Sequence, residues 1–414
     1  MSLENVSIVP LKDVVKRVKV GFVGSCNNDY CSSDEGVPMI RTTNLTTEGI
    51  KLENLKYINN TFHIAHKKSQ LHFGDILIAR HGHNGLASLW EYKFDAQCLN
   101  VVVVEPDESL ANRYYLTYLI NSPLIQKQIK SLTGGSVQSV INTKDIADLL
   151  IPIPSLDKQK EIADFISLFN KKISVCKSIN KNLDDILDSI FKENFIKEFD
   201  NDNNDWKIKN IGELPLIITD YVANGSFASL KENVTILDYE EYAYFIRNTD
   251  LKSKSFQKFV NKHSYDFLKK SSLFGNEVII SNVGDVGSVF LCPFLDKPMT
   301  LGNNMILVKS RDDAINLNFY LFLLFRLNYG QYLISTITAG SVQSKFNKTE
   351  FKSLELTMPN DELIIKFNNL VSPIFDYKNK ISDEIVRLTK LRDTLLPKLM
   401  SGEIDVSKIN CDLE

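Results

Sequence analysis

Hydrophobic positions recur at intervals of three and four residues in two long stretches of the chain. The first stretch, residues 156–199, contains neither Pro nor Gly, and the second begins after Pro359. An apolar stripe with this period over several heptads is typical of a long helix that packs against another helix. We therefore predict two long helices, over residues 155–199 and 361–400, that pack together. The side chains expected in the seam of this helix pair are Phe169, Ile173, Asn180, Leu183, Leu187, Ile381, Ile385, Leu388 and Leu395.

Two residues depart from the simple helical pattern. Asn180 is the polar interruption of the first stripe, and a polar seam residue fixes the register of paired helices at some cost in stability. Pro373 lacks a backbone N–H and predicts a kink or a late helix start in the second stretch.

Short β-rich runs separated by turn residues precede each long helix. They lie at residues 75–79 and 99–104 in the first half of the chain and at 278–281 and 305–308 in the second. A helical segment follows the last run in each half, at residues 113–130 and 317–335. This order predicts a compact mixed α/β domain before each long helix.

The chain is an imperfect repeat of one unit. Thr-Gly-Gly-Ser-Val-Gln-Ser at residues 133–139 recurs as Thr-Ala-Gly-Ser-Val-Gln-Ser at 338–344, with six of seven positions identical. Three further matches keep the same order along the chain. Ile-Arg-Thr-Thr-Asn-Leu (40–45) matches Ile-Arg-Asn-Thr-Asp-Leu (246–251), Phe-Gly-Asp (73–75) matches Phe-Gly-Asn (274–276), and Gly82 with Gly85 matches Gly284 with Gly287. The polar, acidic residues 200–205 form the linker between the two copies.

Composition narrows the class of protein. The 414 residues are 43% hydrophobic, which excludes a mostly disordered chain. The 48 Lys and Arg against 51 Asp and Glu exclude a uniformly basic protein, so a nucleic-acid surface must be a local patch. Six Cys without a Cys-x-x-Cys pair argue against a zinc ribbon or a disulfide framework. No signal peptide or membrane-spanning run is evident, so we expect a soluble, cytoplasmic protein.

The sequence offers no constellation that supports catalysis. A phosphate-binding loop with the G-x-x-x-x-G-K-[ST] spacing is missing, as are H-E-x-x-H, G-x-S-x-G and an Asn-Pro-Pro-aromatic motif. The adjacent acidic residues at 184–185, 240–241 and 312–313 indicate solvated faces rather than acid/base pairs. We expect no catalytic residue, no cofactor and no metal site, and His81 with His83 is a poor zinc pair because the second copy has no His there.

Positive charge is nonetheless concentrated in the globular parts. Residues 247–270 hold seven Lys or Arg against two acids, with aromatic residues between them, and the matching stretch of the first copy is also basic. Lys and Arg along a groove suit phosphate contacts, whereas the alternative is a solvated face. The same placement in both copies favours nucleic acid. The candidates in these stretches are Arg41, Thr42, Asn44, Lys67, Lys68, Arg247, Asn248, Lys252, Lys254 and Lys258.

Two loops that follow a strand carry polar side chains between glycines. One is residues 80–85 and the other residues 281–285. Arg reads guanine and Asn or Gln reads adenine when they are presented to a major groove, so Arg80, His81, Asn84, Ser281 and Asn282 are candidates for base contact. Ordinary hairpin turns are the alternative for these loops, and for any single residue the two interpretations stay open.

The repeated Gly-Ser-Val-Gln-Ser is the third candidate element. It indicates either a junction between the domain and its helix or a phosphate site built from backbone N–H groups, and we favour a structural turn that also lies near DNA. Its candidate contacts are Ser136, Gln138, Ser341, Gln343 and Lys345.

The closing segment Leu-Thr-Lys-Leu-Arg-Asp-Thr-Leu-Leu-Pro-Lys-Leu-Met-Ser-Gly-Glu-Ile (388–404) resembles that of type I restriction–modification specificity subunits. The Gly-Ser-Val-Gln element, the Ile-Pro-Ile-Pro lead into a long helix (151–154) and Phe-Gly-Asp-Ile-Leu (73–77) are similar too. The resemblance spans essentially the whole chain and implies α/β target-recognition domains at residues 1–154 and 206–360. It also implies antiparallel coiled-coil spacer helices at 155–199 and 361–400, with a tail at 401–414. The lead into each helix departs from the family pattern Pro-Leu-x-Glu-Gln.

The resemblance implies a non-catalytic subunit that reads a bipartite site in double-stranded DNA and docks two methyltransferase subunits, which restriction subunits join. Because the polar loops of the two copies differ, we expect half-sites that differ in sequence. Two alternatives are a DNA-acting enzyme with an unrecognised active site and a coiled-coil scaffold whose domains bind protein. A catalytic motif would favour the enzyme, and a DNA affinity that is insensitive to salt would favour the scaffold.

Overall fold

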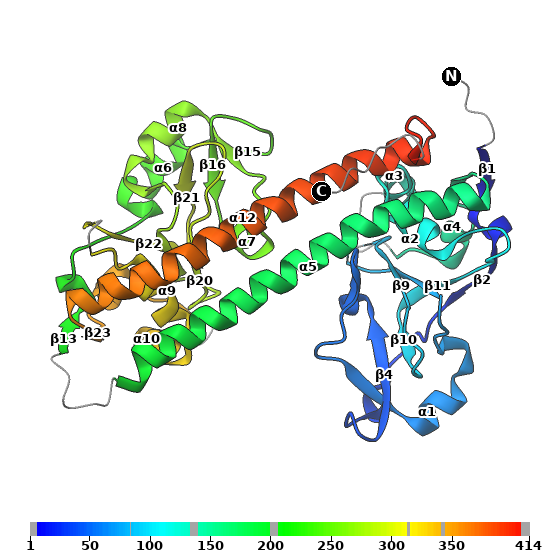
Figure 1. The fold of residues 1–414 in the computed structure, drawn as a ribbon, viewed down its shortest axis with the longest axis horizontal. Helices are drawn as coiled ribbons and strands as arrows, with labels where there is room; N and C mark the ends of the chain where they lie inside the picture. Colours follow the sequence, from blue (N-terminus) through cyan, green and yellow to red (C-terminus); the bar gives the residue numbers. More distant parts are fainter. Residues whose placement is uncertain are drawn as a thin grey trace. The chain divides into compact units, whose positions relative to one another are not determined.

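The computed structural model describes residues 6–82, 84–132, 140–198, 206–312, 315–340 and 344–406. The chain divides into two compact units. Unit 1 comprises residues 1–177 and 384–414, and unit 2 comprises residues 178–383. Figure 1 shows the elements of both units and the two long helices to which both units contribute.

Unit 1 is built from small antiparallel sheets that contain one parallel strand pair. Its strands pair in the orders β1-β12, β10-β4-β7-β3, β2-β11-β8-β9 and β5-β6, and β4 runs parallel to β10. The strands are β1 (Ser7–Pro10), β2 (Val15–Val20), β3 (Tyr30–Cys31), β4 (Gly36–Arg41), β5 (Leu45–Thr46), β6 (Gly49–Ile50), β7 (Lys56–Asn59), β8 (Ile76–Ala79), β9 (Ala87–Leu89), β10 (Gln97–Leu99), β11 (Val101–Pro106) and β12 (Leu150–Ile153).

Unit 2 repeats this strand order in its three sheets, with one further strand, β18, and no counterpart of β5-β6 among its described residues. Its orders are β13-β23, β14-β22-β19-β20 and β15-β17-β16-β21-β18, and β16 runs parallel to β21 as β4 does to β10. The strands are β13 (Lys207–Asn210), β14 (Leu216–Asp220), β15 (Ile236–Leu237), β16 (Ala243–Ile246), β17 (Phe259–Val260), β18 (Ser272–Leu273), β19 (Val278–Ser281), β20 (Val289–Leu291), β21 (Met299–Leu301), β22 (Met305–Ser310) and β23 (Glu355–Met358). The tandem α/β architecture predicted from the repeat is confirmed.

The shorter helices also correspond between the units. The segments predicted as one helix each, 113–130 and 317–335, are two helices each, which corrects the prediction. Ser122 and Leu327 interrupt them in extended conformation, and Pro123 disfavours helical geometry at Ser122. The helices of unit 1 are α1 (Asn60–Ala65), α2 (Arg113–Asn121), α3 (Pro123–Leu132) and α4 (Thr143–Ala147). Those of unit 2 are α6 (Phe227–Asn233), α7 (Asn248–Ser253), α8 (Lys262–Phe267), α9 (Asn318–Arg326), α10 (Asn328–Ile337) and α11 (Lys348–Lys352).

The two long helices are α5 (Leu156–Asn194) and α12 (Asp361–Met400). Helix α5 ends before the predicted residue 199, and residues 196–198 form a 3-10 turn. Helix α12 begins at Asp361 and continues through Pro373, so a late start at that proline is wrong. The missing N–H of Pro373 removes one backbone hydrogen bond, and the surrounding helical turns maintain the helix.

The two helices run antiparallel within each unit. In unit 1, Arg392 Nη1 donates to Asn170 Oδ1 at 2.9 Å, and Lys172 lies 3.2 Å from Glu384. In unit 2, Asn180 Nδ2 donates to Ser382 Oγ at 3.2 Å, so the polar seam residue meets a polar partner. As the residue numbers rise along α5, the residue numbers of the partners on α12 fall, so the two helices are antiparallel.

A charged cluster adds to the helix contacts of unit 2. Asp184 of α5 accepts from Lys378 of α12 and from Arg326 of α9, and Arg326 also pairs with Asp188. Although burial acts to raise it, the hydrogen bonds from Lys378 and Arg326 lower the pKa of Asp184. This cluster ties the last turn of α9 to both long helices.

The ends of the long helices are part of the domain cores. In unit 1, Ile162 and Ile166 of α5 and Leu396 and Leu399 of α12 join the core beneath β8 and β11. In unit 2, Leu187 and Phe191 of α5 and Phe195, which directly follows that helix, pack with Phe367 and Val371 of α12 against α9 and β22. The largest core cluster of each unit therefore includes part of both helices, and the smaller clusters of each unit include residues of its sheets.

The predicted seam residues show graded burial. Ile173, Asn180, Leu187 and Leu388 are buried, whereas Phe169, Leu183, Ile381, Ile385 and Leu395 are half-buried. In the first half of α12 the spacing of three and four residues also runs through Phe367, Leu370 and Tyr377. Phe367 is buried, but Leu370 and Tyr377 are exposed, and Val371 and Phe375 beside this stripe are buried instead.

Candidate DNA interface

The first element of the candidate interface is a turn that follows a central strand in each unit. Arg41 ends β4 and Arg247 follows β16. The backbone N–H of Arg41 donates to Asn44 Oδ1 at 3.1 Å, and that of Arg247 donates to Asp250 Oδ2 at 2.9 Å. Because this hydrogen bond reaches three residues ahead, it closes the turn in both copies and buries the accepting side chain.

The guanidinium groups of these two turns differ. Arg247 makes a bidentate pair with Asp250, with Nε to Oδ2 at 2.9 Å and Nη2 to Oδ1 at 2.6 Å. The Asp250 carboxylate raises the pKa of Arg247. In unit 1, Asn44 donates its amide to Lys51 O at 3.4 Å, and Arg41 Nε is buried without a hydrogen-bond partner among the described residues.

The second element is the glycine loop, which we define as residues 80–85 in unit 1 and 282–287 in unit 2. Gly85 and Gly287 have φ of +88° and +91°, and an added Cβ at Gly85 would lie 2.9 Å from Ile129. Gln126 donates to Gly85 O and Gln331 donates to Gly287 O, both at 2.8 Å. Each loop is therefore fixed by the same positive-φ glycine and a glutamine from the following helix.

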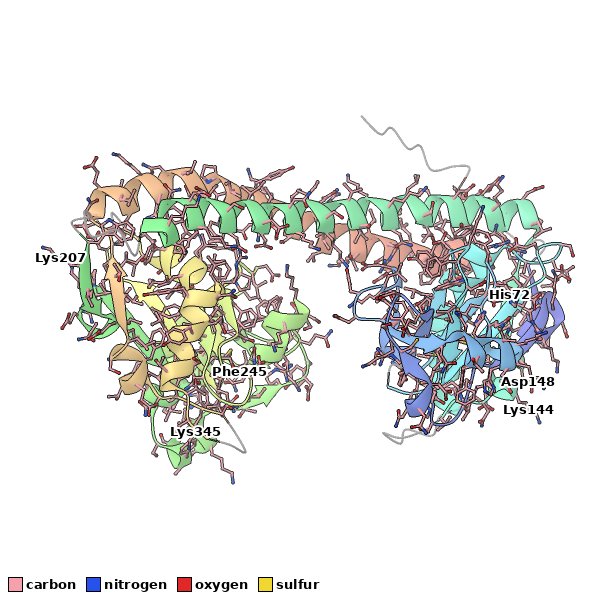
Figure 2. The ribbon with its side chains drawn as sticks, turned by 90° about the horizontal axis from the view of Figure 1, so that it is seen from below. His72, Lys144, Asp148, Lys207, Phe245 and Lys345 are labelled. Atoms are coloured by element: carbon pink, nitrogen blue, oxygen red, sulfur yellow. The ribbon has the colours of Figure 1, made fainter. Side chains whose placement is uncertain are left out.

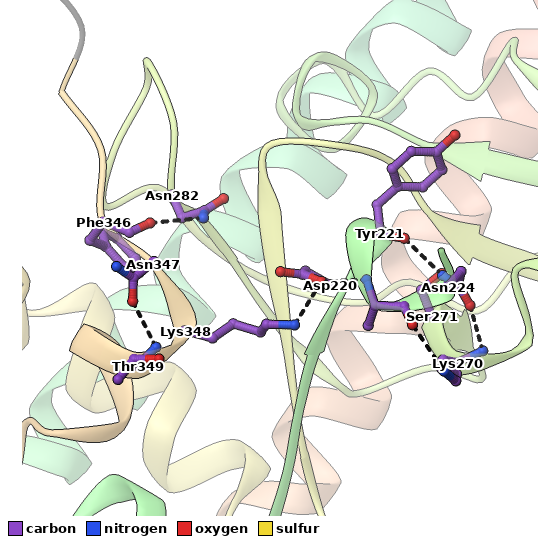
Figure 3. Close-up of polar contacts among 11 residues, drawn as sticks. Asp220, Tyr221, Asn224, Lys270, Ser271, Asn282, Phe346, Asn347, Lys348 and Thr349 are labelled. Atoms are coloured by element: carbon purple, nitrogen blue, oxygen red, sulfur yellow. Dashed lines mark hydrogen bonds and ion pairs between the residues drawn. The ribbon is translucent and has the colours of Figure 1, made fainter. Parts of the chain in front are cut away.

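The glycine loop lies against the segment that follows Gly-Ser-Val-Gln-Ser. Arg80 Nε donates to Ile141 O at 3.0 Å, and Asn282 Nδ2 donates to Phe346 O at 2.9 Å (Figure 3). In unit 2 the N–H of Gly284 also donates to Ser344 O at 2.9 Å. The structure thus brings the glycine loop together with the described residues after Gly-Ser-Val-Gln-Ser in both units, and in unit 2 also with Ser344 of that element.

The segment after this contact leads into a short helix in each unit. Asn347 caps α11 by accepting from Thr349 N at 2.8 Å, and Lys348 pairs with Asp220 at 2.9 Å (Figure 3). A short helix, α4 or α11, thus stands between the repeated heptapeptide and the final strand, β12 or β23.

Asp285 organises the glycine loop of unit 2. Its Oδ2 accepts from Asn248 at 2.9 Å and from Ser288 at 2.7 Å, and Lys252 Nζ lies 2.6 Å away. These hydrogen bonds, that from Asn248 first, lower the pKa of Asp285 to about 2. The carboxylate therefore joins the Arg247 turn to the glycine loop. His83 occupies the matching position of unit 1 and lies outside the described residues.

Several predicted basic contacts of unit 2 are paired within the unit. Lys252 pairs with Asp285, Lys258 with Asp238 and Arg247 with Asp250. Positive charge that looked available in the sequence is thus partly neutralised. In unit 1, Lys67 and Lys68 are exposed on a 3-10 turn, and the described residues offer them no ion pair.

The two remaining lysines of unit 2 are exposed at separate places. Lys254 lies close enough to Lys378 of α12 for its charge to add to the burial that lowers the pKa of Lys378. Lys345 lies at the end of unit 2 that is remote from the unit's part of the long helices (Figure 2). The basic candidates of unit 2 thus do not form one continuous stripe.

Two predicted contacts are internal. Asn44 is buried and closes its turn, and Ser281 is buried with its Oγ accepting from Asn248 at 3.3 Å. Because burial and existing hydrogen bonds occupy both side chains, we remove them from the set of DNA contacts. Thr42, Arg80, Asn84, Asn248 and Asn282 are half-buried around the loops, and His81 is exposed. Ser136, Gln138, Ser341 and Gln343 lie outside the described residues.

Sequence reasoning missed the residues that hold the interface in shape. Gln126 and Gln331 occupy matching positions of the repeat, and that match was the available signal. The role of Asp285 depends on Asn248 and Lys252, which are distant in sequence, and that of Asp250 on its burial, and neither had a signal in the sequence. Within the described ranges, no group of three or more His, Cys, Asp or Glu is placed to hold a metal ion. No helix in those ranges is sufficiently long and apolar to span a membrane.

Comparison with known proteins identifies the family. The sequence model of the type I restriction modification DNA specificity domain matches residues 4–185 and 203–386. The chain therefore belongs to this family and carries two such domains, which confirms the resemblance seen in its motifs. Membership favours the DNA-specificity role over the scaffold and enzyme alternatives, because the specificity subunits of these systems are non-catalytic.

Individual relatives match most of the chain. A putative type I restriction enzyme specificity subunit, MjaX, from Methanocaldococcus jannaschii is 24% identical over 97% of this chain and 94% of its own length. The MjaIX specificity subunit of the same organism is 24% identical over 71% of this chain and 70% of its own length. The solved S subunit of a type I restriction–modification system from M. genitalium has the same fold, with a TM-score of 0.52 and 16% identity over 95% of this chain and 96% of its own.

Proposed function

We propose that this chain selects the DNA site of a type I restriction–modification complex, and that each unit reads one half of a bipartite sequence. One observation carries the proposal: in both units the glycine loop contacts the segment after Gly-Ser-Val-Gln-Ser through the same backbone hydrogen bond, Ile141 N–H to Arg80 O and Phe346 N–H to Asn282 O. In both units the arginine turn is also closed by the same backbone hydrogen bond, whereas the side chains of loop and turn differ. A shared backbone frame with altered side chains is what reading two different half-sites by one fold requires.

The chemistry of the frame suits DNA. Exposed lysines such as Lys67, Lys68 and Lys345 supply phosphate contacts, which position the protein without reading sequence. Arg41, Arg80 and His81 lie on or beside the loops and supply hydrogen-bond donors for base edges. We place residues 1–154 and 206–360 as the two target-recognition domains, and the helices within 155–199 and 361–400 as the spacer.

The partners follow from the family. The relatives are named as specificity subunits of type I restriction enzymes, and this chain offers no catalytic constellation in its sequence. We therefore assign the chain two methyltransferase subunits as partners, with restriction subunits in the complete complex, and a place in the cytoplasm, where such a complex meets DNA.

Methylation mapping tests the proposal. The chain is co-expressed with its cognate methyltransferase subunit in a host without DNA methylation, and the genome is sequenced by a single-molecule method that detects modified adenine. The expected result is one bipartite motif, with unequal halves, that disappears when this chain is omitted. A motif that persists without the chain, or a stable complex that modifies nothing and binds DNA without salt dependence, would contradict the proposal.

A further inference from the structure

The strongest asymmetry between the two units lies in the turn that each places beside its glycine loop. In unit 2 two nitrogens of the Arg247 guanidinium, Nε and Nη2, donate to the buried carboxylate of Asp250. In unit 1 the residue at the position of Asp250 is Asn44, whose Oδ1 already accepts the Arg41 N–H and whose Nδ2 points to Lys51 O. The Asn44 amide has no second carboxylate oxygen and already uses its oxygen and nitrogen in these two hydrogen bonds. The guanidinium of Arg41 therefore has no carboxylate partner at the position that Asp250 occupies in unit 2.

Arg41 is also placed at the interface rather than elsewhere on the unit. It pairs across β4 and β10 with Leu99, and the strand after its turn contacts β9, which directly follows the glycine loop. Thr46 N donates to Ser88 Oγ at 3.0 Å and Ser88 Oγ donates back to Thr46 O at 2.7 Å. The strand that follows the turn, β5, is therefore hydrogen-bonded to the strand that follows the loop, β9.

The side chain of Arg41 is partly enclosed and incompletely hydrogen-bonded. Its Nε is buried and has no partner among the described residues, and it forms no ion pair with any of them. The two Nη groups of Arg41 are not among the buried unpartnered atoms, and the described residues offer them no hydrogen bond, so these donors are available to the acceptors of a ligand.

On the basis of the proposed function, we propose that Arg41 is a specificity-determining residue of unit 1 that reads a guanine in its half-site, while Asp250 withholds Arg247 from DNA. Arginine binds the O6 and N7 acceptors of guanine with two parallel hydrogen bonds. A phosphate contact does not depend on sequence, so both units would be expected to retain it. The free arginine occurs in one unit only, which favours a base contact.

A swap of the residue that controls the arginine tests this inference. Asn44→Asp gives unit 1 the carboxylate of unit 2 and keeps Arg41 in the chain. Complexes with the cognate methyltransferase subunit are assayed on DNA in which each position of the wild-type motif is randomised. Asn44→Asp and Arg41→Ala are expected to abolish the preference for guanine at the same single position of one half-site. Methylation of the preferred sequence is expected to fall about 10-fold to 100-fold, because one bidentate contact to a base is lost.

Two further variants separate base reading from other roles. Arg41→Lys keeps the charge and loses the planar fork, so it relaxes the same position if Arg41 reads guanine and has wild-type selectivity if the contact is a phosphate. Arg247→Ala tests the second part of the inference: it leaves the buried Asp250 carboxylate without its partner and so lowers stability, but the base preference of the half-site read by unit 2 is expected to be retained. The second half-site in the same molecule reports that each variant is folded and active.

Four outcomes overturn the inference. The first is wild-type base selectivity for Asn44→Asp, and the second is wild-type selectivity for Arg41→Ala. The third is a loss of methylation on all sequences for Arg41→Ala that Arg41→Lys restores. The fourth is a loss of base preference in the other half-site for Arg247→Ala. The proposed function fails differently, because then the wild-type complex itself yields no bipartite motif.

Discussion

The turns at Arg41 and Arg247 have the same backbone hydrogen bond and opposite electrostatics. In both, the N–H of the arginine donates to a buried side chain three residues ahead. Asn44 presents an amide nitrogen where Asp250 presents a second carboxylate oxygen, and only the carboxylate holds the guanidinium. One polar atom therefore decides whether an arginine at this place serves the fold or is free for a ligand.

The same contrast extends to the lysines of the two units. Lys252 and Lys258 of unit 2 pair with Asp285 and Asp238, whereas Lys67 and Lys68 of unit 1 have no ion pair within the described part of the chain. A repeat can thus retain the number of basic residues in its sequence and lose much of the positive surface, because neighbouring acids neutralise it.

The largest expected effect is a loss of stability in one unit only, caused by a charge in its core. Leu187 is fully buried in the core of unit 2, so Leu187→Asp places a charge there and costs roughly 4–5 kcal/mol of unfolding free energy. Hydrogen exchange should show protection lost first in residues 178–383. Ile186→Asp on the exposed side of the same helix is the control, with a change below about 1 kcal/mol. Equal effects of both changes would contradict the packing of α5.

The second effect concerns the two turns themselves. Asp250→Ala removes the turn acceptor and the partner of Arg247 together and is expected to cost about 2–4 kcal/mol. Asn44→Ala removes an amide that holds only the turn and should cost about 1–2 kcal/mol. Urea denaturation of both variants against the wild type measures the difference. A smaller loss for Asp250→Ala than for Asn44→Ala would show that the charge pair contributes nothing.

The third expected effect concerns a contact that both units have, the hydrogen bond from the glycine loop to the segment after Gly-Ser-Val-Gln-Ser. Arg80→Ala and Asn282→Ala each remove one hydrogen bond between the glycine loop and the following segment, and each should cost about 1 kcal/mol. Thermal denaturation should give similar shifts for the two variants. A clear difference between them would mean that the loops are not equivalent, and that one side chain has a partner beyond its backbone acceptor.

The smallest effect is a pH dependence confined to unit 2. The pKa of Asp285 falls from its usual value of 3.8 to about 2, so its stabilisation is present above pH about 4 and is lost as the pH falls toward 2. Because the side chain is 43% exposed, the contribution is below about 1 kcal/mol. Asp285→Asn should therefore be less stable than the wild type at neutral pH, and the difference in urea denaturation should shrink on acidification. A difference that is constant with pH would contradict this assignment.

The repeat, the strands and the long helices could be predicted from the sequence because local periodicity determines them. The face of α12 could not be predicted so well. Leu370 and Tyr377 lie in one apolar stripe, Val371 and Phe375 in the adjacent one, and the packing of α9 selects the second. The breaks at Ser122 and Leu327 were also missed, because the apolar pattern continues on both sides of each.

The candidate interface was predictable in its elements and less so in its residues. The glycine loops and the Arg41 and Arg247 turns were visible as matched motifs. The engagement of Arg247 was not visible, because an aspartate three residues ahead is equally compatible with a solvated side chain. Only the burial of Asp250, which depends on strands distant in sequence, turns that spacing into a fixed ion pair.

Unit 1 is assembled from two stretches of chain, and this has a consequence for biosynthesis. Its core includes Leu396, Leu399 and Met400 of α12, and Ile404 and Val406 pack on the same core, while Lys158 of α5 pairs with Asp405. Unit 2 is continuous over residues 178–383. During synthesis, residues 1–177 of unit 1 cannot complete their core until the segment from residue 384 onward has been made. Unit 2 is therefore able to finish folding before unit 1.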